Sequence, residues 1–188
     1  MAVNSLNVIS GVGTLYLQAA PGTFPAFADS IDWTGWGDSG YTIDGVTLEC
    51  SNEFFEVEVD QETSPIRHVL IKNDAKLMVG FAETDAQHLL YSIANSSLVS
   101  GGGTDTLSVG GALFTVWSLG FETVAPGTPA NSSWPRMVKI WRAIAAGTMS
   151  MEFKKGATTM VNVEFLLEAD SSQVATERLY QIIDKTSA

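Results

Sequence analysis

Few residues of this sequence have types and spacings that could carry out chemistry. The two histidines, His68 and His88, stand twenty residues apart, with no H-x-x-x-H pair and no cysteine partner. Zinc sites gather three or four His, Cys or carboxylate ligands at short, recognisable spacings. The sequence therefore predicts no metal site, and we expect a structural or surface role for His68 in a strand and for His88 on a helix.

Two further patterns imitate catalytic ones. Glu56 and Glu58 could resemble the paired carboxylates of a glycosidase, but that chemistry takes its two acids from different elements across a cleft. The run Ser100 to Gly103 lacks the Lys-Ser/Thr that a phosphate-binding loop requires, so we interpret it as a flexible connector. We expect no catalytic residue and no cofactor.

The cysteine and the tryptophans can each be interpreted in two ways. The single cysteine, Cys50, has no disulfide partner in the chain. It is either a small core residue, which we favour, or a reactive thiol. The tryptophans could line a sugar-binding face, but core packing or subunit contact is the favoured use; the candidates for subunit contact are Trp33, Trp36 and Trp134.

Charge is distributed unevenly along the 188 residues, whose formal net charge is −11. Ten acids and no Lys or Arg lie between Met1 and Ile66, and Arg67 is the first base. An acidic surface repels phosphate, which argues against a nucleic-acid-binding protein, although solubilising surface is the simpler interpretation. No apolar run is long enough for a membrane helix, and the first twenty residues do not form a secretory signal, so we expect a cytoplasmic origin.

The elements that would position these residues are mainly strands in one domain spanning 1–188. Alternation predicts strands at 12–19, 46–60, 67–71, 75–83, 106–109, 113–119, 137–145 and 158–168. In 46–60 the acids should face away from a buried apolar side. Helices are expected at 85–94, capped at its start, and near 174–183. Segments 21–45 and 49–65 are expected to be loops or arms, and 125–135 a surface loop.

Several segments in this order resemble the major tail tube proteins of long-tailed bacteriophages. They are Gly13 to Leu17, Trp33 to Gly37, Tyr41 to Leu48, Glu56 to Gln61, Phe81 to Thr84 and Phe165 to Asp170. The resemblance covers most of the chain. It implies a β sandwich or barrel with one flanking α-helix, to which the residues add the short C-terminal helix. Six copies would close into a ring with a continuous β-barrel, and the rings would stack into a tube.

The resemblance also implies a role and partners. The protein would be a structural component of the virion tail, assembled in the host cytoplasm, with a tape measure protein, a tail terminator and baseplate or distal tail proteins as partners. DNA would pass through the lumen without specific binding, because an anionic wall repels it. The expected lumen-facing acids are Glu56, Glu58, Asp60 and Glu164. The expected contacts between rings are Glu49, Glu53, Glu62 and Pro65.

Two other functions fit the same sequence. An inner-tube ring protein of a contractile injection device would share the fold and additionally bind a sheath. A carbohydrate-binding β-sandwich module would use its tryptophans, remain monomeric and have no need of the charge asymmetry.

Overall fold

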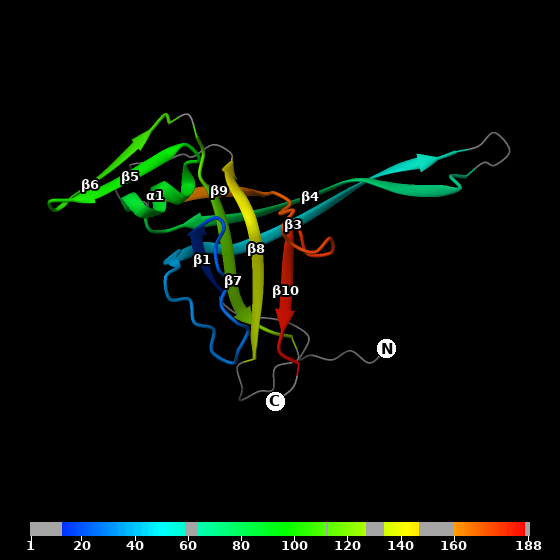
Figure 1. Cartoon of the computed structure of the whole chain (residues 1–188), viewed down its shortest axis with the longest axis horizontal. Coiled ribbons are helices and arrows are strands. Elements are labelled where there is room, and N and C mark those ends of the chain that lie inside the picture. The colour runs from blue at the N-terminus through cyan, green and yellow to red at the C-terminus, as the bar shows by residue number, and fades with distance from the viewer. Residues whose placement is uncertain (1–12, 59–63, 112, 127–133, 147–159, 187–188) are drawn as a thin grey trace.

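The computed structural model describes residues 13–58, 64–111, 113–126, 134–146 and 160–186, and it is mainly β (Figure 1). In chain order the elements are β1 (Thr14–Ala19), β2 (Gly37–Asp38), β3 (Thr42–Val57), β4 (Arg67–Phe81), α1 (Ala86–Ser92), β5 (Ser96–Gly101), β6 (Thr104–Val109), β7 (Val116–Val124), β8 (Pro135–Ala146), β9 (Val161–Leu167) and β10 (Tyr180–Asp184). The predicted fold class is therefore confirmed at the level of a mainly β chain with one flanking helix.

One antiparallel sheet contains all strands except β5 and β6. Its order is β2-β1-β7-β8-β9-β4-β3, and β10 pairs with β8. The two outer strands of this order, β2 and β3, are not paired with each other. In the described part of the chain the sheet therefore does not close into a barrel.

The sheet bends so that β4 and β9 cross β1, β7 and β8 (Figure 1). Side chains from both halves meet in one core, in which Leu15, Phe81, Leu119, Ile140 and Phe165 are fully buried. Alternation explains this core, because every second residue of a strand points to the same face. Along β9 the predicted buried face is confirmed: Val161, Val163 and Phe165 point inward.

A second, smaller core covers the outer face of β1 and β7. The segment between β1 and β2, expected to be irregular, places Trp33 flat against Tyr16, with ring centroids 4.5 Å apart. The Trp33 indole donates a hydrogen bond to Glu122 over 2.8 Å. This packing is possible because Gly120 has no side chain beneath the indole ring.

The C-terminal helix predicted near Val174 to Ile183 is wrong. Residues 180–184 form β10, which pairs with β8 from Tyr180 opposite Ile140 to Asp184 opposite Arg136. Ten residues with scattered apolar positions fit either a helical or a strand period. The edge of β8 decides between them, because it offers backbone partners that an isolated short helix could not match.

The two strands predicted at 67–71 and 75–83 are one continuous strand, β4. Asn73 and Asp74, expected to break it, pair in register with Asn52 and Ser51 of β3. The helix predicted at 85–94 is confirmed as α1, with Asp85 as its N-cap.

Candidate functional site: a projecting hairpin

The feature that stands out from the body is the distal part of the β3–β4 hairpin. We call residues 51–57 of β3 and 67–74 of β4 the arm. Strand β9 pairs with β4 only between Phe81 and Lys76, so beyond Lys76 the hairpin has two strands (Figure 1). Every side chain of the arm is exposed except Val57, which is half-buried.

The arm carries apolar side chains on both faces, because consecutive residues of a strand point to opposite sides, and a bulge decides which of them pair. Glu53 pairs with Lys72, and the next pair is Phe54 with Leu70, which leaves Ile71 as an extra residue. An extra residue on one strand shifts the alternation of the strand beyond it. Phe54 and Leu70 therefore share one face, while Phe55 and Val69 share the other.

This corrects the prediction that residues 46–60 have one buried face. Beyond Cys50 none of the described residues forms a second layer over the strand, and Phe54 and Phe55 are 52% and 59% exposed. Two-stranded hairpins are marginally stable in water, and contiguous exposed apolar side chains mark interaction surfaces. The arm thus has the composition of a protein interface. The described residues of its own chain leave this interface uncovered.

Charged side chains accompany the apolar ones on the arm. His68 lies 3.4 Å from Glu56, and Lys72 lies 2.6 Å from Asp74. The hydrogen bond and charge of Asp74 raise the pKa of Lys72 above its ordinary value. Exposed ion pairs of this kind add little to the stability of a fold. They therefore do not explain why the arm extends from the body.

The acids predicted to line a lumen do not gather at one place. Glu56 lies on the arm, whereas Glu164 lies on β9, 3.5 Å from Lys76. The two acids pair with His68 and Met78 of β4, positions that a strand separates by roughly 33 Å. Glu58 is exposed just beyond the end of β3, and Asp60 lies outside the described residues.

The predicted inter-ring residues also divide. Glu49 lies at the base of the arm and contacts Lys76 over 3.2 Å. The hydrogen bond to Glu49 and the charge of Glu164 raise the pKa of Lys76. Glu53 is on the arm, Pro65 is half-buried just before β4 begins, and Glu62 lies outside the described residues.

Of the tryptophans predicted at subunit contacts, Trp33 is 8% exposed and packs within its own chain. Trp36 and Trp134 are half-buried. The Trp36 ring contacts the rings of Trp33 and Phe24. Trp134 precedes β8, and its carbonyl accepts a hydrogen bond from the amide of Ala125.

The prediction of a core position for Cys50 is wrong. Cys50 is exposed, and its Sγ lies 3.0 Å from the hydroxyl of Tyr180. It lines a cavity of about 550 Å³ at the base of the arm, together with Ile144 and Leu166. The strand position is correct, but the core ends where β9 stops pairing with β4.

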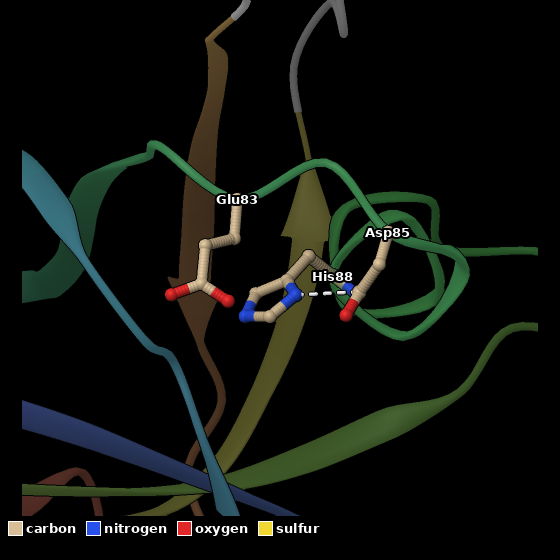
Figure 2. A group of neighbouring side chains, drawn as sticks. All are labelled: Glu83, Asp85 and His88. Atoms are coloured by element: carbon tan, nitrogen blue, oxygen red, sulfur yellow. Dashed lines mark hydrogen bonds and ion pairs between the residues drawn. The ribbon is translucent and has the colours of Figure 1, made fainter.

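One cluster of titratable groups lies at the start of α1, where Glu83, Asp85 and His88 approach one another (Figure 2). His88 is buried, and its Nδ1 lies 2.6 Å from Asp85 Oδ1 while its Nε2 lies 3.1 Å from the carbonyl oxygen of Ser39. Burial alone would raise the pKa of the Asp85 carboxyl. The hydrogen bonds and the charge of His88 outweigh burial and hold that pKa below its ordinary value.

This arrangement favours a hydrogen-bonded clamp over a metal site. Asp85 Oδ1 and the carbonyl oxygen of Ser39 are both hydrogen-bond acceptors, and together they engage both nitrogens of the His88 ring. A metal ligand needs a free lone pair on one of these nitrogens. His88 therefore joins the N-terminus of α1 to the turn before β3. The sequence indicated a capped helix start at Thr84 and Asp85, and the structure assigns the cap to Asp85; no sequence pattern indicated the contact with Ser39.

None of the described helices is long and apolar enough to cross a membrane. No protein-family model matches the chain, and no curated protein matches it either.

Proposed function

We propose that this chain is a structural subunit that assembles with copies of itself into the tail tube of a long-tailed bacteriophage. The observation that carries the proposal is the arm, a two-stranded projection with Phe54, Leu70 and Phe55 in solvent. Burying such side chains against another molecule is favourable, at about 25 cal/mol for each Å² of apolar surface removed from water.

The open sheet supports association between identical chains. In the described part of the molecule β3 pairs with β4 on one side only, which leaves the backbone groups of its other edge available. Such edges pair with other strands unless they are covered. Six copies joined through sheet edges would form the continuous barrel that the resemblance implies, with a closed ring as the stable product.

Charge supports a conduit for nucleic acid. Each copy would contribute a formal charge of −11. Glu49 and Glu164 flank Lys76 on one face of β3, β4 and β9, so this face carries an excess of acid. We propose that it contributes to the lumen wall, with Glu56 on the arm and Glu58 just beyond the end of β3 extending the acidic surface. An anionic wall would let DNA slide without adhering.

The tryptophans weigh against the carbohydrate-binding alternative. Sugar-binding surfaces present exposed aromatic rings, whereas Trp33 and Trp117 are buried. The indole of Trp141 donates to the carbonyl of Glu177 over 2.6 Å. All five tryptophans are buried or half-buried.

Sedimentation and negative-stain microscopy of the purified full chain test the proposal. Over a series of protein concentrations we expect a threshold above which six-fold rings or tubes form. A chain that stays monomeric throughout the series, with a sedimentation coefficient independent of concentration, would contradict it.

A further inference from the structure

A second hairpin, β5–β6, lies at the end of the molecule opposite the arm (Figure 1). Gly101 pairs with Thr104, and the two residues between them, Gly102 and Gly103, both have positive φ. That is the tight type I′ connection of a hairpin. The run predicted to be a flexible connector is thus a defined turn that holds two strands in register.

This hairpin exposes apolar side chains with almost no charge around them. Val99 and Val109 are 69% and 59% exposed, and Leu113 and Phe114, which follow β6, are 87% and 54% exposed. Between 96 and 114 the sequence contains one charged residue, Asp105. A hollow of about 430 Å³ opens beside Val109 and Leu113. We call β5, β6, Leu113 and Phe114 the neutral hairpin surface.

We infer that the neutral hairpin surface is the site on which the arm of a second copy docks, an inference that rests on the proposed self-assembly. The cores of protein interfaces are apolar and depleted of charge, as this surface is. The sequence segment 51–74, which contains the arm, has six acids and only two bases, Arg67 and Lys72. Docking one arm on another would bring like charges together, which is unfavourable. The neutral hairpin surface offers apolar contact without that repulsion.

The positions of the two surfaces agree with this pairing. The arm and the neutral hairpin surface lie at opposite ends of the molecule (Figure 1). A two-fold dimer in which like surfaces meet would bury either the two arms or the two hairpins, but not both. A head-to-tail contact buries the arm of each copy and the hairpin of the next, and it closes into a ring when the rotation between copies permits.

Site-specific cross-linking tests the contact. In a Cys50→Ser background, which removes the only native cysteine, Leu70→Cys on the arm is combined with Val99→Cys on the neutral hairpin surface. The matched control combines Leu70→Cys with Val174→Cys, because Val174 is 61% exposed and lies outside both surfaces. Both proteins are treated with a flexible bismaleimide above the assembly threshold and analysed on denaturing gels.

We expect a ladder of covalent oligomers for Leu70→Cys/Val99→Cys, at least tenfold more abundant than for the control pair. Rings or tubes in the microscope without that excess would overturn the docking site and leave the proposed function standing. A chain that never assembles would overturn both. As a second measurement, Val99→Ser/Leu113→Ser should raise the assembly threshold by about tenfold or more, whereas Val174→Ser should leave it unchanged. An unchanged threshold for the hairpin variant would also overturn the docking site.

Discussion

At the scale of single residues, Asp85 shows how a short sequence signal becomes a structural contact. Its side chain accepts the backbone N–H of His88 over 2.9 Å, which caps α1, and it also meets the His88 ring. Replacing an N-cap aspartate by alanine removes the acceptor for that N–H. We predict that Asp85→Ala lowers the free energy of unfolding by about 1 kcal/mol, measured by urea denaturation. Asp105→Ala, which alters an exposed acid of β6, should change it by less than about 0.5 kcal/mol.

The contribution of Asp85 should depend on pH in a defined direction. Its pKa is held below the ordinary value of 3.8 in the folded chain, so the unfolded state binds a proton at a higher pH than the folded state does. The stabilisation is therefore fully present above the unfolded pKa and is lost as the pH falls through the folded pKa. We predict that the difference in unfolding free energy between the native chain and Asp85→Asn is constant from about pH 6 to 5, because an ordinary aspartate titrates near a pKa of about 4. Below about pH 5 the difference should shrink. A difference that grows on acidification would contradict this assignment.

Gly120 illustrates a residue whose importance the sequence does not reveal. A Cβ at this position would overlap the Trp33 ring. We predict that Gly120→Ala destabilises the chain by about 1–3 kcal/mol and shifts the tryptophan fluorescence, because the indole must move. Gly101→Ala is the control, since nothing lies within 4 Å of the added carbon there. Equal stability of the two variants would count against the packing of Trp33 on β7.

Cys50 marks the limit of reasoning from alternation. It follows Val46 and Leu48 on one side of β3, and both of these residues are partly buried against the core. This position agrees with the core role that was predicted for Cys50. Burial of Cys50 depends on whether another strand continues alongside, and β9 ends its pairing at Leu166 opposite Lys76. The point at which this pairing ends depends on the tertiary structure, and no residue near Cys50 in the sequence indicates it.

At the scale of elements, the strands β8 and β9 and the helix α1 could be predicted because their apolar positions recur with one clear period. The strand predicted at 113–119 was displaced along the chain, since β7 spans Val116–Val124. For the arm, the sequence predicted strand at 46–60 and a loop or arm at 49–65, but not the way in which its two strands pair. Its bulge at Ile71 depends on which residues of β3 and β4 face each other. The consecutive apolar residues Val69, Leu70 and Ile71 were the available signal, since strict alternation cannot bury all three.

Substitutions on the arm should affect assembly without affecting the stability of the monomer. Phe54 and Phe55 make no part of the core, so we predict that Phe54→Ser/Phe55→Ser changes the free energy of unfolding of the monomer by less than about 1 kcal/mol. The same variant should raise the assembly threshold by about tenfold or more, because it removes apolar surface that only a partner would bury.

The matched control for the arm is Tyr41→Ser, an aromatic residue that is 80% exposed but lies outside the arm. It should assemble at the native threshold in sedimentation experiments. If both variants assemble like the native chain, the arm is not the contact that drives association.

At the scale of the whole molecule, the sequence predicted the fold class but not the topology. The regular alternation and the single capped helix were sufficient for a mainly β chain. The order of strands, the bend of the sheet and the use of residues 180–184 as a strand depend on contacts between distant segments. The two hairpins projecting at opposite ends likewise follow from topology, and they give the chain its two candidate surfaces for association (Figure 1).

The central claim is that copies of this chain associate through the arm into closed rings. A cryo-electron microscopy reconstruction of the assembled full chain tests it most directly. The account predicts six-fold rings in which Phe54 and Phe55 of each copy are buried against another copy, and in which Glu164 faces a shared channel. Particles consisting of single chains with the arm in solvent, or an assembly that leaves the arm exposed, would contradict it.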